Sequence, residues 1–428
     1  MWGNIKERIG YTMEQKYEEA KKLLKKYNQQ HVLSFYDNLS NEKKEKLLNQ
    51  IENLDLEQIK KLYEKIKNPS NKNEEVKVTP IEYTDKSKLS KEEKERYKKI
   101  GEEELKKGTI AAVTMAGGQG TRLGHKGPKG TFDLGIGNKK KYLFEIICDT
   151  LKEVKEKYKV TVPWYIMTSE ENNKVTQDFF EEQNYFGYPK EAITFFKQGQ
   201  FPMIDTEGKI LLNEEGIIKE AADGHGGVYI AMLKNNIMDD MRKRGVKKVV
   251  VGGIDNVLVK MFDPIFIGVF IDEGKPAASK SVIKSYPEEK VGVFCKKNGK
   301  PSIIEYTELS KEMANAVDKN GELIYGESNI IVHIFDLDIM EDISKKILPY
   351  HPAFKKANYM NEKGEIVVAK EPNAYKFEAF IFDAFGQLED MSILRVKREE
   401  EFAPVKNASG VDSPETARKL YKNFHGIK

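Results

Sequence analysis

The chain has little cysteine, no long apolar run and no excess of one charge. Two cysteines, Cys148 and Cys295, occur among 428 residues, too few for the disulfide framework of a small secreted protein. No apolar run reaches about 18 residues, the length that a membrane-spanning helix needs. The first twenty residues contain no apolar core of a signal peptide. We therefore expect a soluble protein located in the cytoplasm.

Charges of the two signs nearly cancel. The 71 Lys and Arg residues and the 68 Asp and Glu residues leave a formal net charge of +3. A general nucleic-acid binder normally carries a one-sided basic surface, so we expect no nucleic-acid partner, and no membrane partner either. Hydrophobic residues make up 39% of the chain, which is enough for a globular core. The length predicts two or three domains, and we expect a monomer or a weak dimer.

The first quarter of the chain differs in composition from the rest. Residues 1–107 are rich in Lys and Glu and nearly free of glycine, and apolar residues recur at helical spacing between Leu47 and Leu54. Segments that resemble capping boxes begin at Asp55 and at Ser90. This pattern predicts a helical N-terminal region whose charges form a solvated face.

From Gly108 onward, short apolar runs alternate with polar segments of helical length. The runs are TIAAVTMA, VTVPWYIMT, AITFFK and KKVVVGGID, and the helical segments include 141–158 and 227–244. This alternation predicts βαβ units around a mixed, mainly parallel sheet that is flanked by helices. We therefore divide the chain into a helical N-terminal region (1–107), an α/β domain (108–390) and a small C-terminal region (391–428).

A loop rich in glycine and cations follows the first apolar run. Residues 115–130, MAGGQGTRLGHKGPKG, contain six glycines, two lysines, one arginine and no acid. Glycines let the backbone approach a ligand and direct N–H groups toward phosphate oxygens. Ligands of open α/β sheets bind at the carboxyl ends of strands. The loop predicts a phosphate site in which Arg122 and Lys129 neutralise a polyphosphate. The alternative is a surface turn with incidental cations.

Two common phosphate-binding motifs do not fit this loop. The Walker pattern finds no match, and in the dinucleotide pattern Leu123 stands where the third glycine belongs. A nicotinamide-dependent oxidoreductase would also need an acid about 20 residues further on, at a second strand end. Glu145 and Asp149 fall instead within a predicted helix. These mismatches argue against P-loop and dehydrogenase functions.

The loop resembles the signature of the eukaryotic-type UDP-sugar pyrophosphorylases, G-G-Q-G-T-R-L-G-x-x-x-P-K-G. Further blocks resemble the UDP-N-acetylglucosamine pyrophosphorylase branch, in the family's order: FFKQGQFP, ADGHGGVY, GIDNVLVKMFDPIFIG, EYTELS, KFEAFIFD and EFAPVKNASGVDSPETARKLY. The resemblance extends from about residue 100 to the C-terminus. It implies a Rossmann-like nucleotidyltransferase fold of the GT-A type for the catalytic domain.

The resemblance also implies a reaction. UTP and N-acetylglucosamine 1-phosphate would give UDP-N-acetylglucosamine and pyrophosphate. The attacking phosphate oxygen is already anionic near neutral pH, because its second pKa is about 6, so no general base and no covalent intermediate are required. The barrier is repulsion between two anions, which the protein must offset with cations, a metal ion and in-line positioning. Mg²⁺ is the expected metal, and Mn²⁺ is an expected substitute.

The resemblance carries the family's site residues onto this chain. The catalytic positions are the cations Arg122, Lys129, Lys376 and Lys406. The nucleotide-binding positions are Met115, Ala116, Gly117, Gly118, Gln198, Gly224 and Asp255. The sugar-binding positions are His225, Glu305, Tyr306, Asn329, Phe380 and Phe382. Arg122 and Lys129 would contact the leaving phosphates, Lys376 the reacting α-phosphate and Lys406 the sugar phosphate.

Several of these positions have a second interpretation. Asp255 follows an apolar strand and is well placed to hold Mg²⁺ against the triphosphate, but it is also a candidate helix cap or turn residue. Gln198 offers the donor and the acceptor that a uracil edge requires, and would otherwise be a turn residue. Phe380 and Phe382 would form a wall around the N-acetyl group or would pack in the core.

The block DGHGG departs from the family pattern. The N-acetylglucosamine branch usually reads D-G-N-G-G, so His225 stands where asparagine is expected, whereas the glucose-type relatives carry histidine in G-H-G-D. Gly227 replaces that aspartate here and favours the N-acetylglucosamine branch. A UDP-glucose, UDP-galactose or broad-specificity pyrophosphorylase is the alternative. A non-catalytic nucleotide-sugar binder is a remote one, since all the expected cations and the metal acid are present.

Overall fold

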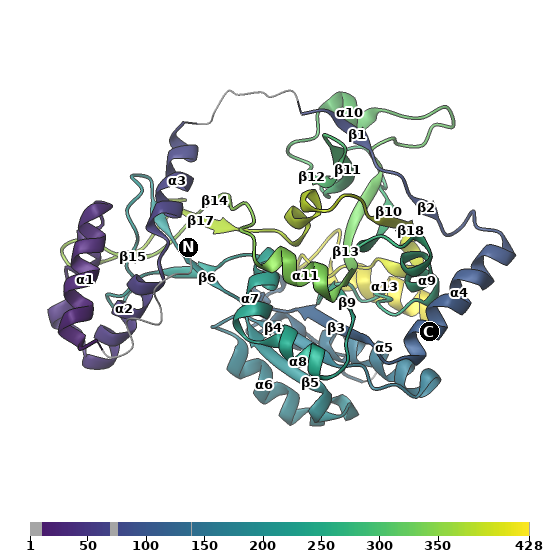
Figure 1. The fold of residues 1–428 in the computed structure, drawn as a ribbon, viewed down its shortest axis with the longest axis horizontal. Coiled ribbons are helices and arrows are strands. Elements are labelled where there is room, and N and C mark those ends of the chain that lie inside the picture. Colours follow the sequence, from purple (N-terminus) through teal and green to yellow (C-terminus); the bar gives the residue numbers. More distant parts are fainter. Residues whose placement is uncertain (1–10, 69–75, 138, 428) are drawn as a thin grey trace. The chain divides into compact units, whose positions relative to one another are not determined.

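The structure of the chain, a computed structural model, describes residues 11–68, 76–137 and 139–427 (Figure 1). The chain forms two compact units, and each is built from separate segments. Unit 1 combines the described part of Met1–Glu74 with Gln200–Gly224 and Pro349–Ala379. Unit 2 comprises Glu75–Gly199, His225–Leu348 and Phe380–Lys428. These units join segments that are distant in sequence, so they do not test the division into three continuous regions. That division stays a prediction.

Unit 2 is organised around one large mixed sheet. Its main path runs in the order β2-β18-β10-β13-β9-β3-β4-β5. The bounds are β2 (Thr84–Asp85), β3 (Ile110–Met115), β4 (Trp164–Thr168), β5 (Ile193–Lys197), β9 (Lys248–Gly253), β10 (Ala277–Ile283), β13 (Glu327–Asp336) and β18 (Ser392–Arg395). Only β13 runs antiparallel to its neighbours on this path, β9 and β10. The prediction of a mainly parallel sheet is confirmed.

A smaller antiparallel group of strands is attached to this sheet at the N-terminal end of β13. Its strands are β1 (Val78–Pro80), β11 (Val293–Lys297) and β12 (Lys300–Ile304). Strand β11 pairs with β1 and with β12, and it meets β13 through one pair of residues, Val293 and Ser328. The group therefore extends unit 2 at the side of β13.

Helices flank the sheet of unit 2, as Figure 1 shows. The helices of unit 2 are α4 (Lys91–Lys106), α5 (Leu143–Tyr158), α6 (Asn173–Glu182), α7 (Val228–Lys234), α8 (Ile237–Lys243), α9 (Pro264–Glu273), α10 (Lys311–Asn315), α11 (Leu337–Ser344), α12 (Arg398–Glu401) and α13 (Pro414–His425). Apolar side chains of the central strands, such as Ala112, Val250 and Ile334, are completely buried in one core with residues of α5 and α9. Apolar strands covered by helices explain the runs that the sequence shows.

Two local predictions can be compared with these helices. Ser90 and Glu93 form the expected reciprocal capping box at the start of α4. The helix expected over 227–244 is divided into α7 and α8 at Asn235 and Asn236. The backbone of Asn236 has a φ of 54°, a left-handed conformation that asparagine tolerates better than most residues and that ends a helix. The break is therefore local.

Unit 1 contains the predicted N-terminal helices and several short strands. The helices are α1 (Met13–Lys26), α2 (Asn41–Asn53) and α3 (Leu56–Lys67). The strands are β6 (Gln200–Pro202), β7 (Ile204–Asp205), β8 (Glu220–Ala222), β14 (His351–Lys355), β15 (Tyr359–Met360), β16 (Ile366–Val367) and β17 (Ala374–Glu378). Leu24, Leu47 and Ile204 are completely buried in one core. Amphipathic helices thus bury their apolar stripe against the later segments of the unit.

Two further observations concern apolar helices and the cysteines. Among the described residues, no helix is both long and apolar enough to cross a membrane. Cys148 and Cys295 are free and buried. Burial raises the pKa of Cys148 to about 12 and that of Cys295 to about 11. Both thiols therefore stay protonated near neutral pH and serve as small apolar side chains.

Candidate active site

The glycine-rich loop begins where β3 ends and folds back on itself. The N–H of Lys129 donates to the carbonyl of Gly118 at 3.0 Å, and the N–H of Gly120 donates to the carbonyl of Gly127 at 2.9 Å. Among the described residues, no acceptor takes the backbone N–H of Gly117 or Gly118. Two backbone donors at a strand end are therefore available to an anion, as the loop composition predicts.

Gly117 and Gln198 lie against each other beside this strand end. A Cβ atom on Gly117 would lie 1.9 Å from Oε1 of Gln198, which is far inside van der Waals contact. The N–H of Gln198 donates to the carbonyl of Thr168, at the end of β4, at 2.8 Å. Gly117 follows β3 and Gln198 follows β5, and both strands are parallel neighbours of β4, so the carboxyl ends of these three strands bring the two predicted nucleotide-binding residues together. Only glycine leaves room for the amide.

Lys129 and Asp255 form an ion pair across the ends of β3 and β9. Nζ of Lys129 lies 3.2 Å from Oδ2 of Asp255, and 17% and 27% of the two side chains are exposed. Burial alone would raise the pKa of Asp255, but the cations Lys129 and Lys406 lower it below its ordinary value. The carboxylate is therefore ionised and faces two of the four predicted catalytic cations.

Asp255 caps no helix in the described part of the chain. It lies in a turn after β9, and the next helix, α9, is capped by Asp263, whose side chain accepts from the N–H of Ile265. The capping interpretation of Asp255 is therefore wrong, whereas its position in a turn is as the alternative supposed. Its carboxylate pairs with Lys129 and does not cap a helix N-terminus.

The remaining predicted cations of unit 2 are more exposed. Arg122 is exposed, and within the described ranges no carboxylate pairs with it. The side chain of Lys406 is 41% exposed, and its Nζ lies 3.9 Å from Oδ2 of Asp412. Burial raises the pKa of Asp412, although Lys406 acts in the opposite direction. Sequence reasoning missed Asp412, for which the only signal is its place in the block SGVDSP.

The three aromatic rings predicted near the sugar form one group in unit 2. The ring of His225 lies 5.4 Å from that of Phe380 and 5.9 Å from that of Phe382, centroid to centroid, and the two phenylalanine rings stack at 5.2 Å. Nδ1 of His225 accepts a hydrogen bond from the N–H of Ile381 at 3.1 Å. The neutral imidazole therefore carries its proton on Nε2. His225 fixes the backbone of this segment as well as facing the two rings.

Glu305 and Asn329 meet at Gly292, also within unit 2. A Cβ on Gly292 would lie 2.8 Å from Oε1 of Glu305, and the N–H of Asn329 donates to the carbonyl of Gly292 at 2.9 Å. Oδ1 of Asn329 accepts from the N–H of Ile331 at 2.9 Å, so its amide NH₂ is the group left to meet a ligand. Tyr306 is 45% exposed.

Gly224 and Lys376 belong to unit 1. Gly224 has a φ of 86°, and a Cβ there would lie 2.4 Å from the carbonyl oxygen of Ala379. The need for glycine at this position is thus explained by the protein's own backbone, whereas the sequence suggested a ligand. Nζ of Lys376, on β17, lies 2.7 Å from Oε1 of Glu378. The roles of both residues stay predictions.

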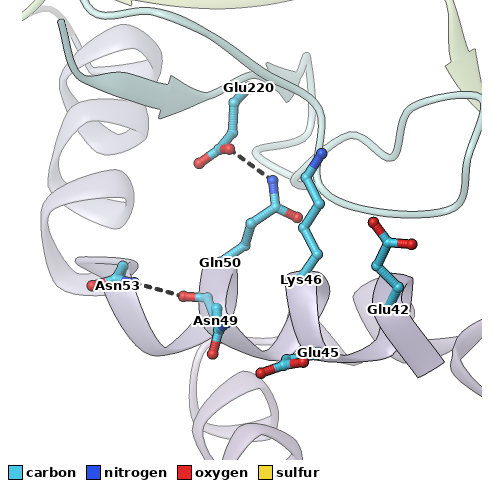
Figure 2. Close-up of a pocket in the computed structure, with 7 residues that line it drawn as sticks. All are labelled: Glu42, Glu45, Lys46, Asn49, Gln50, Asn53 and Glu220. Atoms are coloured by element: carbon cyan, nitrogen blue, oxygen red, sulfur yellow. Dashed lines mark hydrogen bonds between the residues drawn. The ribbon is translucent and has the colours of Figure 1, made fainter. Parts of the chain in front are cut away.

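One polar depression of unit 1 contains none of the predicted residues. It has a volume of about 430 Å³ and is lined by Glu42, Glu45, Lys46, Asn49, Gln50, Asn53 and Glu220 (Figure 2). Figure 2 shows Gln50 of α2 reaching toward Glu220 of β8, and its Nε2 donates to Oε2 of Glu220 at 2.7 Å. Three carboxylates face this depression, so it is unsuited to a triphosphate.

Asn172 is a buried residue that sequence reasoning missed. Its Nδ2 donates to the carbonyl of Ala116 at 3.1 Å, and its Oδ1 accepts from the N–H of Ser169 at 2.8 Å. It therefore ties Ala116, the residue directly after β3, to the turn that follows β4. Its place just after the apolar run VTVPWYIMT, in SEENN, is the signal that would have suggested it.

Comparison with known proteins identifies the family of the chain. The chain is 40% identical to UDP-N-acetylglucosamine diphosphorylase 2 of Arabidopsis thaliana, over 94% of this chain and 82% of that protein. It is 39% identical to UDP-N-acetylglucosamine pyrophosphorylase of Saccharomyces cerevisiae, over 94% and 89%. The crystal structure of uridine diphosphate N-acetylglucosamine pyrophosphorylase from Trypanosoma brucei superposes with a TM-score of 0.82 at 30% identity, over 96% and 85%. Residues 56–415 match the UTP–glucose-1-phosphate uridylyltransferase family, and the chain therefore belongs to that family.

Proposed function

We propose that the chain transfers the uridylyl group of UTP to N-acetylglucosamine 1-phosphate and releases UDP-N-acetylglucosamine and pyrophosphate. Family membership makes the chain a UTP-dependent uridylyltransferase. The choice of the N-acetylated sugar is supported by relatives that are 36–40% identical over most of the chain and bear this name. We infer that the reaction takes place in the cytoplasm.

The observation that carries the proposal is the charge arrangement at the ends of β3 and β9. Lys129 and Lys406 both lower the pKa of Asp255, and the N–H groups of Gly117 and Gly118 have no acceptor among the described residues. Two cations, one ionised acid and two free backbone donors suit a triphosphate with its metal ion. An ionised acid between two lysines serves charge compensation rather than proton abstraction, because its pKa is lowered and not raised.

The chemistry follows from the charges. An oxygen of the sugar phosphate attacks the α-phosphorus of UTP, the new P–O bond forms, and the bond to the β-phosphate oxygen breaks. Lys129 and Arg122 would stabilise the negative charge that develops on the leaving pyrophosphate. Lys406 would hold the attacking phosphate, and Lys376 is proposed at the α-phosphate because of the resemblance alone. No proton has to be removed from the nucleophile.

The residues fit a magnesium ion that arrives with the nucleotide. Among the described residues, no three His, Cys, Asp or Glu side chains cluster as a metal site, so a cage made entirely of protein is not formed there. Mg²⁺ usually binds one or two carboxylates and completes its shell with phosphates and water. Asp255 is the carboxylate that would hold it, and the ion would supply charge compensation for the triphosphate.

Glucose 1-phosphate is the second candidate substrate, and His225 is the observation that favours it. The asparagine expected in the N-acetylglucosamine branch is absent, and Nδ1 of His225 is used by the N–H of Ile381. Only the opposite ring edge can face a ligand. We therefore propose that the enzyme also turns over glucose 1-phosphate, at a lower kcat/KM than the N-acetylated sugar.

The test is pyrophosphate release from UTP and Mg²⁺ with each of the two sugar phosphates. The proposal requires a higher kcat/KM with N-acetylglucosamine 1-phosphate. A higher value with glucose 1-phosphate would establish the second candidate. Binding of UDP-N-acetylglucosamine without turnover of any sugar phosphate would establish a non-catalytic binder and refute the proposal.

A further inference from the structure

The segment that carries Lys406 is fastened to the turn that carries Asp255. The N–H of Val405 donates to the carbonyl of Asp255 at 2.9 Å, and the N–H of Val257 donates to the carbonyl of Ala403 at 3.1 Å. Residues 255–257 and 403–405 therefore lie side by side, although about 150 residues of chain separate them. The distance between Asp255, the proposed ligand of the metal ion, and Lys406, the lysine proposed to hold the sugar phosphate, therefore depends on this junction.

Asn256 is the side chain at the centre of the junction. It is 4% exposed. Its Nδ2 donates to the carbonyl of Glu401 at 2.7 Å, and its Oδ1 accepts from the N–H of Ala403 at 2.9 Å and from that of Leu258 at 3.2 Å. Both the NH₂ group and the oxygen of the carboxamide thus form hydrogen bonds with the backbone. Only asparagine offers this donor and this acceptor on a side chain of this length.

The far end of the segment is anchored by buried charges. Glu401 is 1% exposed, and its carboxylate pairs with the completely buried Lys280 and, at 3.2 Å, with Lys86. Asp263 also pairs with both lysines. A network of this kind leaves Glu401 little freedom, because breaking one buried pair would strand a charge. The carboxamide of Asn256 therefore binds the backbone of residues 401–403, a segment that the ion pairs of Glu401 already hold in place.

We propose that Asn256 is a positioning residue that sets the place of Lys406 relative to Asp255. This inference rests on the proposed function, since it concerns the sugar phosphate that Lys406 would hold. Asn256 itself touches neither the substrate nor the metal. Its action passes through residues 403–405 to Lys406, the next residue along the chain. A shift of about 1 Å in a catalytic group can cost on the order of 10²-fold in rate, so a rigid junction has a direct use here.

The test is a double-mutant cycle of Asn256→Ala and Lys406→Ala. We expect Asn256→Ala to lower kcat/KM for the sugar phosphate by on the order of 10²-fold, mainly by raising KM for that substrate while KM for UTP changes little. In the Lys406→Ala background, the same substitution should cost less than about 3-fold, since residues acting through one group are not additive. Penalties that multiply in full would overturn the proposal.

A matched control separates positioning from folding. Gln29 in unit 1 is also buried, and its carboxamide also bridges two backbone groups, donating to Gly208 at 2.8 Å and accepting from the N–H of Ile210 at 3.0 Å. We expect Gln29→Ala to lower the melting temperature about as much as Asn256→Ala does and to leave both KM values unchanged. Equal kinetic losses in the two variants would refute a specific role of Asn256.

A readout that needs no turnover completes the test. Hydrogen exchange of the amides of Ala403 and Val405 should accelerate in Asn256→Ala and stay at the wild-type rate in Lys406→Ala. If Asn256→Ala does not fold, Asn256→Asp keeps the acceptor, loses the donor and takes its place in the cycle. A wild-type protein without pyrophosphate release would sink the proposed function and this inference together. An active wild type with unchanged exchange in the asparagine variant would overturn the inference alone.

Discussion

Removing the charge of Lys129 should separate catalysis from stability. We consider Lys129→Met, which keeps most of the apolar stem and deletes the ammonium group. The sequence alone predicts a solvated lysine whose loss changes folding little. In the structure, Lys129 is only 17% exposed and lies 3.2 Å from the carboxylate of Asp255. The substitution therefore also strands an acid.

The magnitudes follow from this geometry. At an effective dielectric constant of about 20, two charges 3.2 Å apart attract by about 5 kcal/mol. Desolvation of both groups offsets most of this attraction, and measured pairs range from about 0–1 kcal/mol when exposed to 3–5 kcal/mol when buried. For this partly buried pair we expect unfolding free energy to fall by about 1–2 kcal/mol. Loss of one charge-assisted contact to the leaving pyrophosphate should lower kcat by on the order of 10²-fold or more.

Two assays and two reference variants decide this prediction. Pyrophosphate release measures kcat, and urea unfolding measures stability. Lys126→Met removes an exposed cation of the same loop and should change neither. In the Asp255→Asn background, the stability cost of Lys129→Met should nearly vanish, because its partner is already neutral. Near-full activity of Lys129→Met would refute our interpretation of the loop.

Four further predictions concern the metal, the sugar and pH. Asp255→Asn should raise the Mg²⁺ concentration that gives half-maximal activity, because a neutral oxygen binds a hard cation more weakly; an unchanged titration would exclude Asp255 as a ligand. Because neighbouring lysines lower the pKa of Asp255, this residue stabilises the fold above pH about 4, and wild type and variant should converge in unfolding free energy as pH falls below that value. His225→Asn should shift the kcat/KM ratio toward N-acetylglucosamine 1-phosphate over glucose 1-phosphate by roughly 2- to 12-fold, the worth of one hydrogen bond; an identical ratio would make His225 a packing residue. Burial lowers the pKa of His333 to about 3, so protonation of the unfolded state should cost wild type about 2 kcal/mol between pH 7 and pH 5, and His333→Phe should lack this part of the pH dependence in urea titrations.

Short-range patterns predicted four neighbouring parallel strands of the sheet. The four apolar runs contain β3, β4, β5 and β9, because strands covered on both faces need apolar residues at every position. Antiparallel β13 was not foreseen, since its run SNIIVHIF looks like any other buried strand. Direction depends on how the chain returns to the sheet, and no single stretch of residues encodes that.

Long-range pairs lay beyond sequence reasoning for the same reason. Lys129 and Asp255 were both predicted site residues, yet nothing in either block indicates that they pair across 126 positions of sequence. The sequence also did not indicate which segments make up unit 1, because β6, β7 and β8 lie in the chain between two stretches with strong α/β patterns. These contacts are set by the complete packing of the chain, whereas capping, turns and apolar periodicity are set within a few residues.

The pairing of Lys129 with Asp255 bears on how the proposed reaction begins. Before the substrate binds, the two side chains pair with each other, so both stay ionised and their charges compensate each other. A triphosphate that arrives with a divalent cation can offer each of them a new partner, phosphate oxygen for Lys129 and the cation for Asp255. Each of the two charges then keeps a partner, so the exchange avoids leaving a partly buried charge unpaired. Nucleotide without the divalent cation would compete with Asp255 for Lys129 and leave the carboxylate stranded. Under this argument, the affinity for UTP should depend on Mg²⁺ in the wild type and depend on it less in Asp255→Asn, which calorimetry of UTP binding with and without the metal can measure.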